Sequence, residues 1–111
     1  MIKGVGKDEP MVVNEKGGKQ SRVHYRFDLV DPRAMFEMCR VLKEGADKYG
    51  EWNWRNIPVH DHLNHLLIHV YAYLAGDRQD DHLAHALCRA MFALAVDLEG
   101  KNSEKLAPAA Q

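Results

Sequence analysis

The chain has 111 residues, a length that predicts a single domain with one modest hydrophobic core. Hydrophobic residues make up 46% of the sequence and charged residues 28%, which excludes a disordered, highly charged protein. The formal net charge is −1, so the chain lacks the overall positive field that would attract a nucleic-acid polymer. We therefore expect no nucleic-acid partner.

The cysteines and the apolar runs indicate a protein of a reducing compartment. Cys39 and Cys88 lie in apolar runs without CxxC spacing, so we interpret both as small core residues and not as a disulfide or zinc site. The first ten residues lack the apolar core of a signal peptide, and no apolar run reaches the length of a membrane span. We expect a cytoplasmic protein with no membrane partner.

Residues 1–30 predict an extended N-terminal arm with at most short strands, because glycines and Pro10 interrupt every helical period. Gly17 and Gly18 form a small glycine loop in this arm. Two interpretations stay open: a solvated, flexible arm, or an anion-binding loop in which glycine lets backbone N–H groups approach phosphate oxygens. The candidate phosphate-binding residues are Lys19, Gln20, Ser21 and Arg26, with Lys48 further along the chain.

Asp31 and Pro32 predict the start of a helix that ends at Gly50. One face of this helix carries Glu37, Glu44 and Lys48. That face is either solvated, with a Glu44–Lys48 pair, or a carboxylate wall for a divalent metal. The opposite, apolar stripe is expected to pack into the core and consists of Met35, Met38, Cys39, Leu42, Ala46 and Tyr49.

A short connection over residues 50–58 contains both tryptophans. Trp52 and Trp54 either pin this loop onto the core or flank a flat ring, with Asn53 offering a donor and an acceptor to a base edge. Two further helices are predicted at 59–75 and 81–99, each followed by a glycine. These boundaries divide the chain into the arm at 1–30, a helical domain at 31–100 and a frayed tail at 101–111.

Histidines gather on one face of each of these two helices. His62, His65 and His69 follow i, i+3, i+7 spacing, and His82, His85 and Arg89 repeat it. A short loop would make the helices antiparallel and turn both faces toward one cleft, with Asp77, Asp80 and Asp81 at its end. Such a set can bind metal, transfer protons or bind phosphate, or it can be a structural histidine network.

Several blocks of the sequence, in order, resemble one known family. They are GGKQS, YRFDL, EGADKYGEWNWRNI, DHLNHLLIH and LAGDRQDDHLAHALCRAMFAL. Across residues 14–98 the chain resembles the phage dATP/dGTP diphosphohydrolase family, which is similar to MazG-like all-α nucleoside triphosphate pyrophosphatases. KYGxxNW and GDxxxDHLAHA are the most specific blocks.

The resemblance implies hydrolysis of a purine deoxynucleoside triphosphate, dATP or dGTP, to the monophosphate and pyrophosphate with Mg²⁺ or Mn²⁺. It implies an all-α fold, a small bundle of three main helices beside the irregular N-terminal arm, completed by oligomerisation as a homodimer or homotetramer. A phage-encoded chain would act in the host cytoplasm. Trp52, Asn53 and Trp54 are then the candidate base-binding residues.

The chain departs from the MazG-type pattern of ExxE on one helix and ExxD on the next. Glu44 and Asp47 form an ExxD, but His82 and His85 stand where a second acidic pair is expected. The candidate metal ligands are therefore Glu44, Asp77, Asp81 and His85, and the candidate catalytic residues are Glu44, Asp81 and His85. Further candidates are Glu37, Asp47, His62, His65, His69, His82 and Arg89.

Two alternative functions stay open. Repeated Asp-His pairs suggest an HD-like metal phosphohydrolase that releases inorganic triphosphate, although Asp61-His62 and Asp81-His82 reverse the HD order. The other alternative is a small helical module that binds nucleotide or metal without turnover.

Overall fold

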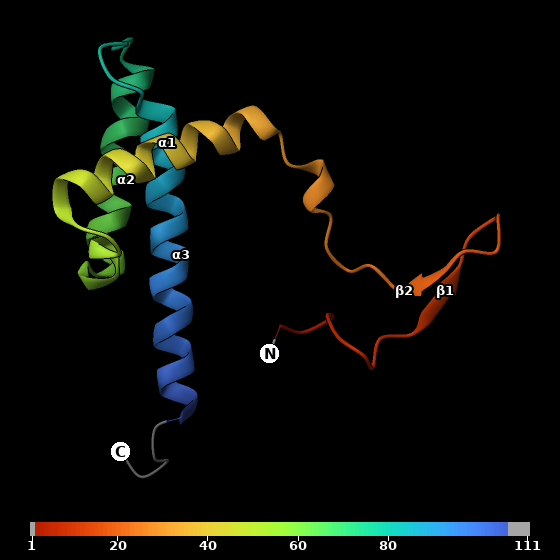
Figure 1. Cartoon of the computed structure of the whole chain (residues 1–111). Coiled ribbons are helices and arrows are strands. Elements are labelled where there is room, and N and C mark those ends of the chain that lie inside the picture. The colour runs from red at the N-terminus through yellow and green to blue at the C-terminus, as the bar shows by residue number, and fades with distance from the viewer. Residues whose placement is uncertain (1, 107–111) are drawn as a thin grey trace. The chain divides into compact units, whose positions relative to one another are not determined.

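The computed structural model describes residues 2–106, and side chains up to residue 101. Its contacts divide the chain into two compact units, with the division between Asp31 and Pro32. The first unit contains a two-stranded sheet and the second contains three helices (Figure 1). The chain is thus an all-α protein with an irregular N-terminal arm, as the sequence predicts.

The first unit is built around a β-hairpin. Strand β1 (Met11–Val13) pairs antiparallel with β2 (Lys19–Ser21), and a single 3-10 turn, η1 (Phe27–Leu29), follows. The Asn14 side chain organises the turn, because its Oδ1 accepts the N–H of Lys16 at 3.0 Å and that of Gly18 at 2.8 Å. The N–H of Gly17 donates to the Asn14 carbonyl at 3.0 Å. The glycine loop of the sequence is therefore a hairpin turn.

The second unit begins with α1 (Pro32–Tyr49), which starts and ends where the sequence predicts. Gly50 follows with φ of +99°, a conformation that favours glycine. The 3-10 helix η2 (Asn53–Asn56) leads to α2 (Val59–Leu74), and Gly76 with φ of +94° ends that helix.

Helix α3 (His82–Leu106) is longer than predicted. The expected end at Gly100 is wrong, and the tail is helical as far as Leu106. A single glycine inside a helix costs only about 1 kcal/mol relative to alanine, so it does not by itself stop one. The rest of the predicted frayed tail, residues 107–111, lies outside the described residues.

Helices α2 and α3 lie side by side and run in opposite directions, and α1 crosses them (Figure 1). Met38 and Val41 of α1 pack with Cys88 of α3 in a small core. The predicted apolar stripe of α1 is correct for Met38 and Leu42, which pack in or against this core. It is wrong for Cys39, Met35 and Tyr49, which are exposed. Val41 takes the place that the prediction gave to Cys39, since it lies one turn from Met38.

The helix pair buries histidines and exposes leucines. The His62 side chain has no exposed surface and His82 is 8% exposed, whereas Leu74 is 72% exposed. We call the exposed apolar surface of the pair the leucine face; it consists of Leu63, Leu67, Tyr71 and Leu74 on α2 and Leu83, Leu87, Leu94 and Leu98 on α3. Among residues 2–106, no helix combines the length and the hydropathy that crossing a membrane requires.

Candidate functional site

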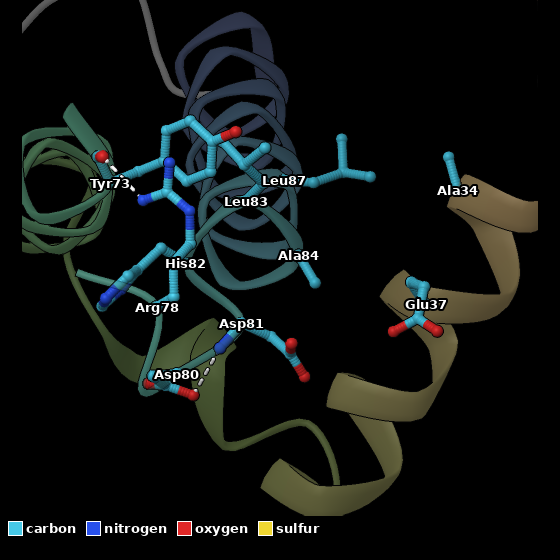
Figure 2. A pocket seen from close by; sticks show the side chains of 10 residues that line it. All are labelled: Ala34, Glu37, Tyr73, Arg78, Asp80, Asp81, His82, Leu83, Ala84 and Leu87. Carbon is cyan, nitrogen blue, oxygen red and sulfur yellow. Dashed lines mark hydrogen bonds between the residues drawn. The ribbon is translucent and has the colours of Figure 1, made fainter. Parts of the chain in front are cut away.

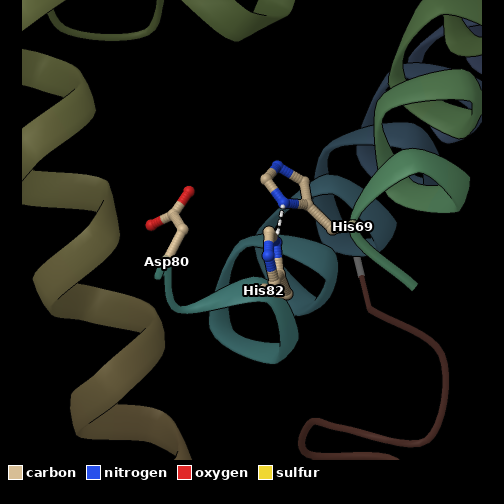
Figure 3. Close-up of side chains that lie close together, drawn as sticks. All are labelled: His69, Asp80 and His82. Atoms are coloured by element: carbon tan, nitrogen blue, oxygen red, sulfur yellow. Dashed lines mark hydrogen bonds between the residues drawn. The ribbon is translucent and has the colours of Figure 1, made fainter. Parts of the chain in front are cut away.

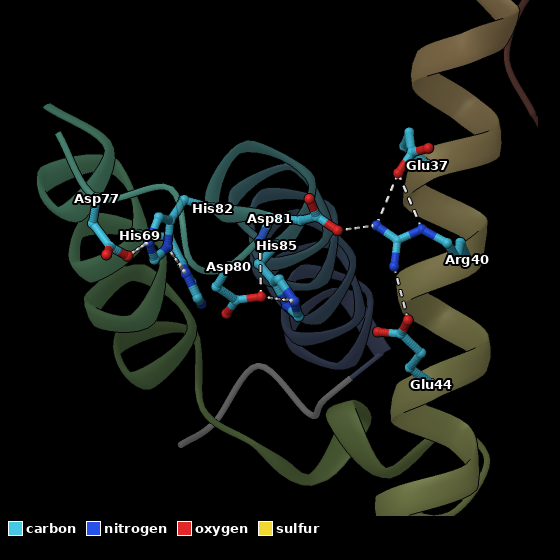
Figure 4. A network of polar contacts seen from close by, with 9 residues as sticks. All are labelled: Glu37, Arg40, Glu44, His69, Asp77, Asp80, Asp81, His82 and His85. Carbon is cyan, nitrogen blue, oxygen red and sulfur yellow. Dashed lines mark hydrogen bonds and ion pairs between the residues drawn. The ribbon is translucent and has the colours of Figure 1, made fainter.

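A cluster of imidazoles and carboxylates lies where α2 ends and α3 begins (Figure 4). His82 Nε2 lies 2.5 Å from Asp77 Oδ2, and His82 Nδ1 lies 3.0 Å from His69 Nδ1. His85 Nε2 lies 3.5 Å from Asp80 Oδ1. We call these five residues the histidine cluster. The short connection between the two helices is what brings them together, as the sequence predicts.

Hydrogen bonds connect three side chains of the cluster in a chain. A carboxylate accepts, so His82 donates its Nε2–H to Asp77. One proton lies between His82 Nδ1 and His69 Nδ1, which are 3.0 Å apart. Asp77 therefore orients the His82 ring so that its Nδ1 faces His69.

Asp80 and His85 complete the cluster. Asp80 Oδ1 accepts the backbone N–H of Asp81 at 2.8 Å, which orients the carboxylate at the start of α3. The His85 ring stacks on the His69 ring, with centroids 5.0 Å apart and planes inclined by 15°. The stacking and the Asp80 contact hold His85 at the edge of the cluster.

Local electrostatics keeps His69 neutral and Asp80 ionised. Burial lowers the pKa of His69, and the nearby His85 and His82 lower it further. The hydrogen bond from the Asp81 N–H lowers the pKa of Asp80, and the neighbouring imidazoles act in the same direction. A neutral imidazole and an ionised carboxylate are the forms that bind a metal ion.

Three members of the cluster offer a set of ligand atoms close together. His69, Asp80 and His82 each present one such atom, and these atoms all lie within 4.8 Å of one another (Figure 3). The four metal ligands predicted from the sequence are not members of this set, and they lie in two different places. Asp77 and His85 contact members of this set, whereas Glu44 and Asp81 contact Arg40.

A second group of charges, the Arg40 network, joins α1 to the start of α3 (Figure 4). The Arg40 guanidinium contacts Glu37 at 2.8 Å, Glu44 at 2.7 Å and Asp81 at 2.5 Å. The hydrogen bond to Glu37 is the main cause of a raised pKa at Arg40. The sequence analysis missed Arg40, although its spacing of three and four residues from the two glutamates was a signal for these pairs.

A cavity of about 470 Å³ lies between α1 and the start of α3 (Figure 2). One wall is formed by Tyr73 and Arg78, whose guanidinium carbon lies 3.8 Å from the Tyr73 ring centroid. Glu37 and Asp81 of the Arg40 network and Asp80 and His82 of the histidine cluster also line it, together with Ala34, Leu83, Ala84 and Leu87. The cavity therefore adjoins both groups.

The tryptophan loop is attached to the helix pair. Trp54 stacks on Phe92, with centroids 4.7 Å apart and planes inclined by 8°. His62 Nε2 donates to the Trp54 carbonyl at 2.9 Å, and Arg89 donates to His62 Nδ1 at 3.1 Å. Trp54, His62 and Arg89 therefore hold the loop on α3.

The other candidates of the helical unit lie outside the histidine cluster. Trp52 is 59% exposed, and the Arg55 guanidinium lies 4.3 Å from its ring centroid. Asn53 is half-buried in η2, and His65 is exposed on α2. Asp47 pairs with Lys43 at 2.5 Å, and Lys48 lies 5.1 Å from the Tyr49 ring centroid.

The phosphate-binding candidates of the first unit are partly engaged. Arg26 pairs with Asp28 at 2.9 Å, and Asn14 takes the N–H groups of Gly17 and Gly18 that an anion-binding loop would need. Asn14 was not singled out from the sequence; its place before the Glu-Lys-Gly-Gly turn is a typical signal for such a side-chain capture. Lys19, Gln20 and Ser21 are exposed in β2.

The helical unit thus brings imidazoles and carboxylates together beside a cavity. The family described as "dATP/dGTP diphosphohydrolase, N-terminal" matches residues 14–105, and the chain belongs to that family. A dATP/dGTP diphosphohydrolase of Salmonella phage PMBT28 is 36% identical over 71 residues, covering 60% of this chain. The match spans only 24% of that relative's length. No solved structure matches the chain.

Proposed function

We propose that the chain hydrolyses a purine deoxynucleoside triphosphate, dATP or dGTP, to the monophosphate and pyrophosphate in a metal-dependent reaction. The observation that carries this proposal is the histidine cluster, which brings imidazoles and carboxylates together beside the cavity. The family to which the chain belongs supports the substrate class. The related phage protein carries the same activity in its name.

The chemistry requires positive charge and a placed base. A divalent ion, Mg²⁺ or Mn²⁺, supplies the charge that neutralises phosphate oxygens and lowers the pKa of a bound water. The mixed nitrogen and oxygen ligands of the cluster suit Mn²⁺ better than Mg²⁺, which prefers oxygen. His85 is the residue we assign to moving the proton of the attacking water, because it lies at the edge of the cluster and contacts Asp80.

The cavity is the place we assign to the rest of the nucleotide. Arg78 offers positive charge to a phosphate, and the apolar side chains of Leu83 and Leu87 offer a surface for the purine or the sugar. Trp52 and Asn53 stay candidates for the base. Glu44 and Asp81 stay candidates for the reaction, although Arg40 already balances their charge.

A second candidate function is a nucleotide- or metal-binding domain without turnover. The observation that favours it is the length of the related phage protein, of which the match spans 24%. A longer relative leaves room for the reacting groups elsewhere in its chain. Hydrolysis by the present chain alone is therefore the decisive observation.

The test is product analysis with the purified chain. It is incubated with each of the four deoxynucleoside triphosphates and Mn²⁺ or Mg²⁺, and products are separated by chromatography. We expect dAMP or dGMP with pyrophosphate. Deoxynucleoside with inorganic triphosphate would indicate the HD-like reaction, and nucleotide binding without products would indicate the non-catalytic domain. The variant Asp80→Asn, prepared identically, controls for a contaminating phosphatase, because a contaminant would be unaffected by it.

We also propose that the chain functions as a homodimer or homotetramer joined through the leucine face. The buried apolar residues of the described part are few: Met38, Val41, Ala86, Cys88 and Ala93. The part of the leucine face that does not line the cavity, Leu63, Leu67, Leu94 and Leu98, continues from α2 to α3. A second copy packed on this part would complete a four-helix bundle. On α3, Ala84 and Met91 pack toward α1, which leaves the leucines on another face of that helix.

Light scattering measures this assembly directly. We expect a mass of two or four chains, and a monomeric mass for the pair of changes Leu67→Lys and Leu94→Lys. Phe36→Lys is the matched control, because Phe36 is also apolar and is even more exposed but lies on α1. A folded wild-type chain that stays monomeric at high concentration would contradict the proposal.

A further inference from the structure

We propose that His69, Asp80 and His82 form a binding site for one transition-metal ion of the Mn²⁺ to Zn²⁺ series, with Asp77 orienting His82 from outside the ligand set. The catalytic role of this ion rests on the proposed function. The new statement is which residues are its ligands. Binding itself is open to a test without any nucleotide.

The two Nδ1 atoms are spaced as two ligands of one ion. They lie 3.0 Å apart, and two nitrogens each about 2.1 Å from an ion, at a right angle, are separated by about 3.0 Å. The ion would replace the proton that the two nitrogens share. His69 then carries its proton on Nε2, so the imidazole stays neutral and no proton needs to leave the protein.

Asp80 supplies the third ligand, and it is already oriented. Its carboxylate accepts the Asp81 N–H at 2.8 Å, and its ligand atom lies within 4.8 Å of those of both imidazoles. Figure 3 shows the Asp80 side chain beside the two rings. One negative charge beside two neutral nitrogens leaves a bound divalent ion with a net positive charge, which can attract a phosphate oxygen.

Asp77 supplies the hydrogen bond that usually supports a metal-binding histidine. Metal-binding histidines usually donate their other ring N–H to a carboxylate or carbonyl, which fixes the ring and makes the ligand nitrogen more basic. His82 donates Nε2–H to Asp77 at 2.5 Å, so Nδ1 is the free ligand nitrogen. Because His82 is only 8% exposed, its ring is also held by packing.

The ligand types select the class of ion. Imidazole suits Mn²⁺, Fe²⁺, Co²⁺, Ni²⁺ and Zn²⁺, whereas Mg²⁺ and Ca²⁺ prefer an all-oxygen set. Three protein ligands leave positions open on the ion, as in catalytic metal centres. Asp80 and His82 also line the 470 Å³ cavity, so an open position can face a ligand in it.

The experiment measures metal binding by the full, tag-free chain in the absence of nucleotide. Calorimetry with Mn²⁺ and Zn²⁺ gives stoichiometry and affinity, and the visible absorption of bound Co²⁺ reports nitrogen ligands directly. We expect one ion per chain, with Mg²⁺ at least about 10-fold weaker than Mn²⁺. Asp77→Asn is expected to weaken binding by about 10- to 100-fold, and Asp80→Asn and His69→Asn by more.

His65→Asn is the matched control, since His65 is an exposed histidine of α2 outside the cluster. Circular dichroism confirms that each variant is folded, and Asp80 is exposed, so its change is the one least apt to disturb folding. Unchanged affinity in both Asp80→Asn and His69→Asn, or a folded wild-type chain that binds no Co²⁺, would overturn the site.

The outcome is separable from the fate of the proposed function. Metal binding that depends on His69 and Asp80, without any hydrolysis of nucleotide, contradicts the proposed function and supports this site. Hydrolysis by the wild-type chain, together with unchanged metal affinity in both variants, supports the function and overturns this site.

Discussion

The histidine cluster and the Arg40 network stand next to each other at the start of α3 and differ in how their carboxylates are balanced. Asp80 and Asp81 are neighbours in sequence, yet Asp80 faces imidazoles and Asp81 faces a guanidinium. A metal ion brings positive charge to its ligands. In the Arg40 network it would compete with the guanidinium of Arg40 for the carboxylates. In the histidine cluster no guanidinium contacts Asp80 among the described contacts. The side chain that contacts a carboxylate is therefore a better indicator of an ion site than the number of acidic residues nearby.

The largest expected effect is that of removing metal from the histidine cluster. We expect the rate of dATP or dGTP hydrolysis to fall at least about 100-fold in excess EDTA, which is a rise of about 2.7 kcal/mol in the barrier. Added Mn²⁺ should restore it. The same treatment should leave the far-ultraviolet dichroism unchanged, because the helices are held by packing. Full turnover in EDTA would remove the metal from the mechanism.

The next prediction compares one residue from each region. His85→Asn should lower kcat by about 100-fold, the usual contribution of a proton-transferring residue, with little change in melting temperature. Asp81→Asn should leave kcat within a few-fold of the wild type, because Arg40 already neutralises Asp81. The opposite result, a large loss of kcat in Asp81→Asn alone, would place Asp81 in the reaction, as the sequence analysis suggests.

A smaller effect is expected from Arg40→Gln, which removes the guanidinium from the Arg40 network. Glu37, Glu44 and Asp81 would then repel one another without a counter-charge, so the melting temperature should fall by a few degrees. Millimolar Mg²⁺ should recover part of this loss in the variant and change the wild type little. Lys43→Gln is the control, since Lys43 pairs only along its own helix, with Asp47. Equal responses to Mg²⁺ in both variants would mean that Arg40 does not hold these carboxylates together.

Local sequence signals predicted the parts of the structure that depend on local chemistry. The start of α1 at Pro32 and the glycines after α1 and α2 follow from capping and backbone preferences. The inward positions of His62, His69 and His82 follow from helical spacing and a short loop. In contrast, the contact between Arg40 and Asp81 joins residues 41 positions apart. It depends on how α1 crosses α3, which no local pattern specifies.

The same limit explains the ligand set. The sequence analysis favoured acidic residues as metal ligands because the resembling enzymes use them. Whether Glu44 or Asp80 is available depends on which side chain lies beside it, and that is a property of the packed helices. Asn14 shows the limit on a smaller scale, since its side chain takes the N–H of Gly18, one of the loop donors that the phosphate-loop interpretation requires.

The smallest expected effect concerns His62, which lies away from both regions and holds the tryptophan loop. Burial lowers the pKa of His62, and the nearby Arg89 acts in the same direction. As the pH falls through about 6.5, the unfolded chain therefore takes up a proton at this residue before the folded chain does. The free energy of unfolding should decrease below that pH and stop decreasing once the folded His62 is also protonated.

His62→Gln tests this assignment, because glutamine can still donate to the Trp54 carbonyl but does not titrate. Urea unfolding at several pH values, followed by tryptophan fluorescence, gives the free energy of unfolding of both chains. We expect the decrease below pH 6.5 to be smaller in the variant, with the remainder supplied by His69, whose pKa is also lowered by burial. Parallel curves for the two chains would show that His62 is not a source of the pH dependence. They would leave the histidine cluster as the part of the molecule in which folding and protonation are coupled.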